Sequence, residues 1–424
     1  MRRPVNEVMT EQDTHLDAAE SGSGRHILLV HQLFVAGDQA GGTRHFELAR
    51  ELGGEGDRVT VVTSPVSYLS GKPKPIATDL PAGLRIRRAS LLLGGSGGFV
   101  ARVISFLSFM VSSFWTGLRV RDVDLVWGTT PPIFQAPTAW LLARMKGVPF
   151  VLEVRDLWPD FAVELGVLKS PVLIRMAKGL ERFLYEKADL ILVNSPGFEE
   201  HVRREGGKNV VLVANGVDPT QFAPEDDGAA VRAERGWGER FVSLYAGAHG
   251  IPNDLDVVLD AAAAAEDDDG LFAFVGAGRE LERLRQRADE LGLRNVEFVG
   301  ARPKSEMAGF LAAADVCIAI LQPLPLFRTT YPNKVFDYMA AGRPVVLAID
   351  GVIRRVVDEA NGGTFVLPGD ADALLAAIRA YRLDPDLRRE HGQAGRSAVL
   401  GSFTRAKQAQ ALRQSFLELL ARKP

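Results

Sequence analysis

Residues 329–346, Thr-Thr-Tyr-Pro-Asn-Lys-Val-Phe-Asp-Tyr-Met-Ala-Ala-Gly-Arg-Pro-Val-Val, combine residue types that fit chemistry on a phosphate and a sugar. A proline and Asn333 open a predicted helix, Lys334 lies in its first turn, and Asp337 follows three residues later. The free N–H groups of a helix start, its positive dipole end and an ammonium all attract phosphate. A carboxylate one turn further would repel that phosphate, so we expect Asp337 to accept hydrogen bonds from sugar hydroxyls. The stretch therefore predicts a nucleotide-sugar site.

Glycines follow the first predicted strand of each half of the chain. Gly41 and Gly42 would let the backbone approach a phosphate or a sugar closely, although their spacing is not the dinucleotide fingerprint. A flexible loop without a ligand is the alternative. In the second half, Gly250 has the same conformational freedom, and His249 could donate to a phosphate or a sugar. An exposed histidine without a role is the alternative there.

Three charged residues, Glu153, Arg155 and Asp156, lie at the end of a predicted strand, 150–154. Buried charges need partners, so a mutual salt bridge is one interpretation. The other interpretation places Arg155 or Asp156 beside the reacting sugar or the acceptor. No His/Cys cluster has zinc spacing, and the Asp-x-Asp pairs do not follow apolar strands. We therefore expect neither a metal nor another cofactor.

Apolar strand-like runs alternate with amphipathic helix patterns along the whole chain. Such alternation predicts the α/β class, with mainly parallel sheets and helices on both faces. The predicted strands are 26–30, 59–63, 84–88, 125–128, 150–154, 190–194 and 210–214, then 241–246, 271–275, 296–299, 316–320, 344–348 and 364–367. The predicted helices are 42–52, 132–146 and 171–188, then 254–264, 279–291, 305–314, 334–341, 351–360 and 371–381.

The length of 424 residues favours two domains. We predict a disordered tail over 1–25, an N-terminal Rossmann-like acceptor domain over 26–220, and a C-terminal Rossmann-like donor domain over 221–403. These two doubly wound domains would face each other across a cleft. An amphipathic helix over 404–424 follows and could cross back to the first domain. The net charge of −3 gives no support to nucleic-acid binding, and the single cysteine excludes a disulfide framework.

The segment Phe99–Leu118 carries one charge in twenty residues, close to the length that spans a membrane. Spanning is disfavoured because the segment lies between strands of one predicted sheet. A buried or half-buried helix is one interpretation. The other is a helix that rests on the membrane surface and reaches a lipid-linked substrate.

Together these residues resemble the glycosyl transferases group one family, whose members are retaining enzymes of the GT-B fold. The resemblance runs over nearly the whole chain after Arg25 and is nearest to the WbuB-like branch of O-antigen and capsule enzymes. Its most specific parts are Glu-Val-Arg-Asp-Leu-Trp-Pro-Asp160, Asn-Gly-Val-Asp218 with Phe222 and Pro224, Val-Gly-Ala-Gly278, and Pro-Asn-Lys-Val-Phe-Asp-Tyr-Met-Ala-Ala-Gly342.

The resemblance implies roles for particular residues. Asp337 takes the place of the family's second glutamate, which holds the ribose. Gly41 and Gly42 match the glycine loop near the donor phosphates. Asn333 and Lys334 lie in the loop whose backbone faces the diphosphate.

Two departures from the family pattern affect the donor site. The wider family has a glutamate eight residues before the ribose carboxylate, where this chain has Thr329. The usual Arg and Lys after the first strand of the second domain are replaced by Ala-His-Gly-Ile251. Charge on the diphosphate would then be neutralised by Lys334, Arg328 and His249, and the catalytic candidates are Asp156, Arg155 and Lys334.

The resemblance predicts a metal-independent hexosyl- or N-acetylhexosaminyltransferase. It would move a sugar from a nucleotide sugar to a lipid-linked glycan on the cytoplasmic face of the plasma membrane, in polysaccharide synthesis. One rival hypothesis is a sugar-nucleotide epimerase or hydrolase on the same architecture. Another is a catalytically silent subunit that binds nucleotide sugar, which the threonine at position 329 would suit. The sequence does not identify the sugar, the base or the linkage.

Overall fold

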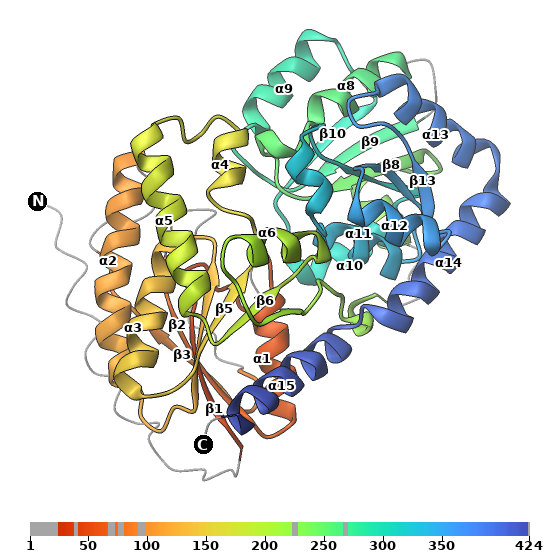
Figure 1. Cartoon of the computed structure of the whole chain (residues 1–424). Helices are drawn as coiled ribbons and strands as arrows, with labels where there is room; N and C mark the ends of the chain where they lie inside the picture. Colours follow the sequence, from red (N-terminus) through yellow and green to blue (C-terminus); the bar gives the residue numbers. More distant parts are fainter. Residues whose placement is uncertain are drawn as a thin grey trace, which may run out of the picture.

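The computed structural model describes residues 24–37, 41–66, 73–74, 80–91, 99–222, 228–265 and 270–422. Two parallel β-sheets form the cores of two domains, which lie side by side in Figure 1. The first sheet has seven strands in the order β3-β2-β1-β4-β5-β6-β7, and the second has six in the order β10-β9-β8-β11-β12-β13. Both follow the doubly wound pattern, in which strands are added first on one side of the first strand and then on its other side. The predicted fold class is confirmed.

The strands form where the apolar runs predicted them, because a strand buried on both faces needs a near-continuous hydrophobic segment. In the first domain they are β1 (His26–Val30), β2 (Arg58–Thr63), β3 (Leu84–Arg88), β4 (Leu125–Thr130), β5 (Phe150–Val154), β6 (Leu190–Val193) and β7 (Val210–Leu212). In the second they are β8 (Phe241–Ala246), β9 (Gly270–Val275), β10 (Val296–Gly300), β11 (Val316–Ile320), β12 (Val345–Ala348) and β13 (Gly363–Phe365).

Helices cover both faces of the first sheet. Side chains alternate along a strand, so Leu28 and Val30 pack toward one helical layer while Ile27 and Leu29 pack toward the other. The helices of this domain are α1 (Arg44–Gly54), α2 (Phe99–Leu118), α3 (Ala136–Lys146), α4 (Asp160–Glu164), α5 (Pro171–Lys187) and α6 (Glu199–Arg204). The predicted helix over Phe99–Leu118 is confirmed with the same bounds.

The second domain repeats this layering with helices α7 (Ala229–Arg235), α8 (Leu255–Ala264), α9 (Leu281–Glu290), α10 (Lys304–Ala313), α11 (Asn333–Ala340), α12 (Val352–Glu359), α13 (Ala371–Leu383) and α14 (Pro385–Ser402). Its core divides into two clusters, one on each face of the sheet. The sequence analysis did not predict α14. Within the described residues, no helix is both long and apolar enough to span a bilayer.

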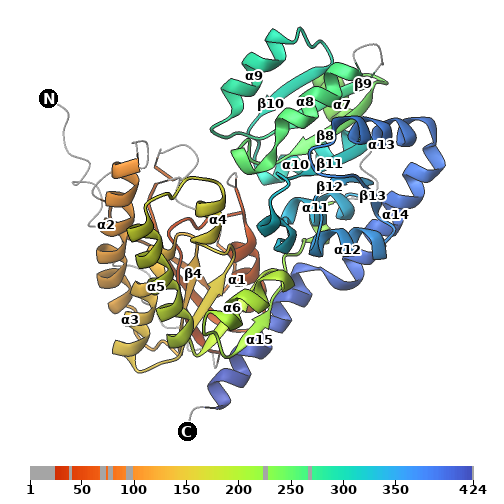
Figure 2. The ribbon, with the colours of Figure 1, turned by 45° about the horizontal axis from the view of Figure 1, so that its top comes forward.

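The last helix, α15 (Arg405–Ala421), returns to the first domain and packs against α1 (Figures 1 and 2). Leu412, Phe416 and Leu419 on one face of α15 are buried with the core residues of the first sheet. The first domain is thereby joined to both ends of the second. Most of the predicted N-terminal tail, 1–23, and residues 223–227 near the start of the predicted C-terminal domain lie outside the described residues.

Candidate functional site

The helix predicted to bind phosphate is α11, and it begins at Asn333 as expected. Its Tyr338 hydroxyl accepts a hydrogen bond from the Ala246 N–H (2.8 Å) and donates to the Ala246 carbonyl (2.9 Å). These two bonds tie the helix to the end of β8. The N-terminus of α11 is thereby held beside the carboxyl end of the second sheet, where doubly wound proteins bind their ligands.

Lys334 in the first turn of α11 is a cation whose hydrogen-bond partners among the described residues are all neutral. Its Nζ donates to the Tyr245 hydroxyl (2.9 Å) and to Asn253 Oδ1 (2.8 Å), and it lies 4.3 Å from the centre of the Tyr245 ring. Within the described residues no carboxylate forms an ion pair with it. Burial lowers the pKa of Lys334 to about 7. A desolvated ammonium without an anion is suited to receive one.

Asn333 and Asp337 form a pair one turn apart on α11. Asn333 Nδ2 donates to Asp337 Oδ2 (3.1 Å), while Oδ1 of each residue is buried with no partner among the described residues. Burial raises the pKa of Asp337, and Lys304 and Asn333 partly oppose this effect. Two acceptor oxygens without donors can accept hydrogen bonds from the hydroxyls of a bound sugar.

His249 lies inside the second domain and not on the surface. Its ring is fully buried 6.0–6.3 Å from the rings of Tyr245, Phe274 and Phe298, and both ring nitrogens lack a partner among the described residues. Burial lowers its pKa to about 4, with a further contribution from Lys334. The lowered pKa favours the neutral imidazole at pH 7, which can still donate one hydrogen bond. The contact of His249 with a donor phosphate stays a prediction.

The loop 247–250 packs closely on the glycines that follow β9. A Cβ atom at Gly278 would lie 2.1 Å from the carbonyl oxygen of His249, and one at Gly276 would lie 1.9 Å from that of Gly247. These two glycines therefore serve the close packing of the two loops. Gly250 follows His249 in an extended conformation, and its contact with a donor stays a prediction.

The glycine loop of the first domain leads into α1, whose first turn is fixed by buried charges. Arg44 Nε and His45 Nε2 contact the two oxygens of Glu153 at 2.9 and 2.6 Å, and burial keeps all three groups from water. Glu153 therefore binds α1, and among the described residues no ion pair joins Arg155 to Glu153 or to Asp156, as the salt-bridge interpretation would require. Gly41 takes a left-handed φ of 134°, and a Cβ atom at Gly42 would meet no atom within 4 Å. The roles of Gly41 and Gly42 in donor binding stay predictions.

Arg155 and Asp156 follow β5 and have different surroundings. Arg155 donates to the Thr129 hydroxyl (3.0 Å) and to the carbonyls of Thr130 (3.1 Å) and Pro131 (2.9 Å), so it holds the loop after β4. Asp156 keeps contact with solvent. Desolvation of the Asp156 carboxylate by the surrounding protein raises its pKa to about 6, although the positive charge of Arg155 lowers it in part. Of the two, Asp156 has the titration behaviour of a general base.

The position of the missing family glutamate, Thr329, lies where the two domains touch. The Thr329 carbonyl accepts a hydrogen bond from the Ser195 hydroxyl (2.5 Å), and the Thr329 hydroxyl donates to the Leu326 carbonyl (2.6 Å). A Cβ atom at Gly197 would lie 2.5 Å from the Thr329 Cα. Neighbouring Arg328 pairs with Asp350 at 2.8 Å and is well exposed. Both side chains are engaged locally, and their contacts with a donor stay predictions.

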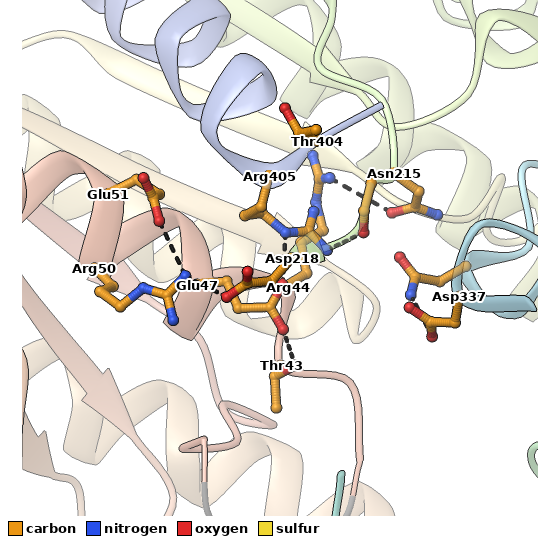
Figure 3. Close-up of polar contacts among 12 residues, drawn as sticks. Thr43, Arg44, Glu47, Arg50, Glu51, Asn215, Asp218, Asp337, Thr404 and Arg405 are labelled. Carbon is orange, nitrogen blue, oxygen red and sulfur yellow. Dashed lines mark hydrogen bonds and ion pairs between the residues drawn. The ribbon is translucent and has the colours of Figure 1, made fainter. Parts of the chain in front are cut away.

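A second junction between the domains is ionic and was not predicted (Figure 3). The buried carboxylate of Glu47 on α1 accepts from Lys304 Nζ of α10 (2.7 Å) and from Arg405 Nε of α15 (2.7 Å). Thr43 Oγ1 also donates to Glu47 and accepts from Lys304. Burial alone would raise the pKa of Glu47, but Arg405 and Lys304 lower it to about 2. The same junction lies close enough to Asp337 to influence its titration.

The sequence analysis assigned no chemistry to Asn215, yet this residue also joins the domains. Its Nδ2 donates to the Tyr331 carbonyl (2.6 Å) just before α11, and its Oδ1 lies 3.5 Å from Arg44 Nη1. The only available sequence signal was its position directly after a predicted strand.

Within the described residues, no three His, Cys, Asp or Glu side chains gather as a metal-binding group.

Comparisons with known proteins identify both domains. Residues 40–216 match the family model described as "Glycosyl transferase 4-like domain", and residues 240–383 match "Glycosyl transferases group 1". The probable glycosyltransferase WbjE of Pseudomonas aeruginosa is 27% identical over 64% of this chain and 69% of its own. The putative colanic acid biosynthesis glycosyl transferase WcaI of Escherichia coli K12 is 25% identical, covering 80% of this chain and 88% of its own.

Solved structures share the arrangement of both domains. Sucrose-phosphate synthase from Thermosynechococcus elongatus superposes with a TM-score of 0.78 at 21% identity, covering 94% of this chain and 99% of its own. HepE from Anabaena, solved with UDP and glucose, gives a TM-score of 0.70 at 18% identity, covering 93% of this chain and 100% of its own. The shared architecture is the GT-B fold, as predicted, while the WbuB-like branch stays a prediction. The two family models cover most of the chain between them, and the chain belongs to the glycosyl transferases group 1 family.

Proposed function

We propose that this glycosyltransferase retains configuration while it moves a hexosyl or N-acetylhexosaminyl group from a nucleoside-diphosphate sugar to a lipid-linked glycan. The observation that carries the donor half of the proposal is Lys334, a desolvated ammonium with only neutral partners at the first turn of α11. The structural relative HepE was solved with UDP and glucose, which supports a nucleotide-sugar donor. The named activities of WbjE and WcaI favour transfer over the epimerase, hydrolase and silent-subunit alternatives.

During transfer, the bond between the anomeric carbon and the β-phosphate oxygen breaks. The acceptor oxygen forms the new bond on the face of that carbon from which the diphosphate leaves, because attack from the opposite face would invert the configuration. The nucleoside diphosphate leaves with an additional negative charge. Lys334 and the N–H groups at the start of α11 would stabilise that charge, because both are fixed before the reaction begins. Asp156 would take the proton from the acceptor hydroxyl. No metal is needed in this proposal, so we expect turnover to persist in excess EDTA.

We propose that Asp337, paired with Asn333, accepts hydrogen bonds from the ribose of the donor. We expect the wild-type protein to bind a 2′-deoxynucleoside diphosphate at least about tenfold more weakly than the ribonucleotide, since a buried acceptor would lose its donor. Asp337→Ala should weaken binding of the ribonucleotide and remove the discrimination. Isothermal titration of both nucleotides against both proteins measures this coupling. If Asp337→Ala still distinguished the two nucleotides as strongly as the wild-type protein does, the ribose would not be bound by Asp337.

The pH dependence of kcat/KM should be bell-shaped, since this parameter reports ionisations of the free enzyme. Asp156 must be ionised to act as a base, so activity should fall as pH drops below its pKa of about 6. Lys334 must be protonated to attract the donor, so activity should fall as pH rises above its pKa of about 7. Initial rates over this range check the profile. Asp156→Asn should lose the acid limb and Lys334→Met the alkaline limb; a wild-type profile in either variant contradicts that assignment.

A thermal-shift screen with UDP, GDP, ADP, CDP and dTDP tests the donor site and identifies the base. A nucleotide that binds the folded protein should raise Tm by an amount that grows with the logarithm of its concentration once this concentration exceeds Kd. The matching donor sugars are then assayed with and without lipid-linked glycan acceptors. Product formed only with acceptor supports transfer, whereas nucleotide release without acceptor supports a hydrolase. Binding with no turnover across the donor and acceptor panel supports the silent subunit.

The acceptor half of the proposal places the reaction at the cytoplasmic face of the membrane. WcaI is named for colanic acid biosynthesis, a polysaccharide process, and the outer layer of the first domain includes the apolar helix α2. A protein that takes a polyprenyl-linked acceptor must approach the bilayer in which the polyprenyl chain is embedded. We therefore propose peripheral membrane contact through Phe99–Leu118.

A further inference from the structure

Helix α2 has apolar side chains on the face that solvent reaches as well as on the face that packs against the domain. Ile104, Leu107, Val111 and Trp115 recur every three or four residues and are each 38–63% exposed. The opposite face holds Phe109, which is buried in the core together with Ser105 and Ser113. A helix that only covers a sheet would have polar side chains on its outer face. The exposed stripe is therefore unexplained by folding of the domain.

The exposed apolar surface continues onto the two neighbouring helices. Helix α3 contacts both α2 and α5, and these three helices lie next to one another in Figure 2. Ten of the fourteen large apolar side chains that are exposed in the described part of the chain lie within 104–176. The ten are Ile104, Leu107, Val111, Trp115, Leu141, Met145, Val167, Val172, Leu173 and Met176. Such concentration marks an interaction surface, since exposed apolar residues are normally scattered.

The same three helices are positively charged, although the whole chain has a net charge of −3. Helices α2, α3 and α5 carry seven lysines and arginines but only two glutamates, and one of these, Glu181, is buried. Arg144 and Arg175 are exposed beside Met145 and Met176. Apolar side chains bordered by cations fit the interface of a bilayer that contains anionic lipids. A second copy fits poorly, because a symmetric contact would place like charges opposite each other.

We infer that the outer layer of the first domain, formed by α2, α3 and α5, is a docking face for an anionic lipid bilayer. The inference extends the proposed acceptor half, since it enlarges the contact from α2 to three helices and specifies anionic lipid. Trp115 and the aliphatic side chains enter the headgroup region, and the exposed Arg144 and Arg175 contact lipid phosphates, whereas Lys178 and Arg182 pair with Asp160 and Glu205. Because α5 follows β5, its apolar first turns lie at the carboxyl edge of the sheet, the edge that bears Asp156. The bilayer would therefore lie next to the acceptor side of the site.

Flotation of the full-length protein with vesicles tests this inference. We expect wild-type protein to float with vesicles of phosphatidylcholine and phosphatidylglycerol, and about tenfold less with phosphatidylcholine alone. Leu107→Ser combined with Val111→Ser should abolish flotation, and Arg144→Glu combined with Arg175→Glu should reduce it more than tenfold. Leu367→Ser combined with Leu383→Ser is the matched control, because these exposed leucines lie on the second domain.

Three outcomes would overturn the inference. Wild-type protein could fail to float, the helix variants could float like the control, or sedimentation could show that the helix variants abolish a dimer. Thermal shifts with nucleoside diphosphates are recorded on the same proteins. The helix variants should keep the wild-type response, so loss of docking remains distinguishable from failure of the proposed donor site.

Discussion

Replacing Lys334 by methionine is expected to reduce kcat by about 10²–10³, the usual effect of removing one group that stabilises developing negative charge. Methionine keeps an apolar chain of similar length next to the Tyr245 ring. The folded protein should be no less stable, because the lysine ammonium is desolvated and its partners, Tyr245 and Asn253, are neutral. We expect Tm to stay the same or rise. Steady-state kinetics at saturating donor, together with thermal denaturation, separate catalysis from folding.

Arg389→Met is a control for the loss of one positive charge. Arg389 lies on α14, is 67% exposed, and pairs with an even more exposed carboxylate, Asp386. An exposed pair of this kind contributes little, so turnover and Tm should stay close to wild type. Near-normal kcat in Lys334→Met would contradict the placement of the leaving diphosphate at α11. A large fall in Tm would show that the lysine is structural.

The sheets could be predicted because each strand is a short apolar run between helices, and burial of such a run is a local property of the sequence. Helix α14 illustrates the limit of this approach. Its segment Pro385–Ser402 contains Gly392, Gly395 and Gly401, which have low helix propensity. The first two glycines are needed for packing, since a Cβ atom at Gly392 would lie 2.2 Å from the Gly342 carbonyl oxygen. Tertiary contact stabilises this helix against its local preference.

The candidate site could be predicted where one segment carries it, and not where distant segments meet. Asn333, Lys334 and Asp337 belong to one helix, so their spacing alone indicated a shared role. Glu153 was grouped with Arg155 and Asp156 at the end of a predicted strand, but its side chain lies on the same face of β5 as Val151, under α1. That alternation was visible in the sequence, whereas its partner Arg44 lies 109 residues earlier. His249 comes shortly after a predicted strand, where the sequence indicates an exposed loop. Only the structure shows that its ring lies among aromatic side chains.

The Glu47 junction shows most clearly what local pattern misses. Its two cations, Lys304 and Arg405, follow Glu47 by 257 and 358 residues, and nothing in the spacing connects them. In the sequence of its own helix, each of these charged residues looks like one that is exposed to solvent. The junction has structural consequences because it joins α1, α10 and α15 in one buried cluster.

Replacing Glu47 by glutamine is therefore expected to lower Tm by on the order of 10 °C. The substitution keeps the size of the side chain but leaves the fully buried Arg405 without a counter-charge, which typically costs about 3–5 kcal/mol. The pKa of Glu47 is lowered from 4.5 to about 2, so its carboxylate stabilises the fold above pH 4.5 and loses this effect as pH falls toward 2. Scanning calorimetry of both proteins at pH 7 and at acid pH should show their Tm values converging.

Glu51→Gln provides the matched control on the same helix. Glu51 pairs with Arg50 at 3.0 Å, but both side chains are about one-third exposed, and Arg50 keeps a second partner in Asp218. The change should therefore shift Tm by no more than about 2 °C. Adding Arg405→Leu to Glu47→Gln should recover part of the lost stability, because the uncompensated cation is removed. Equal shifts for Glu47→Gln and Glu51→Gln would mean that the junction between the domains contributes no more than an ordinary surface ion pair.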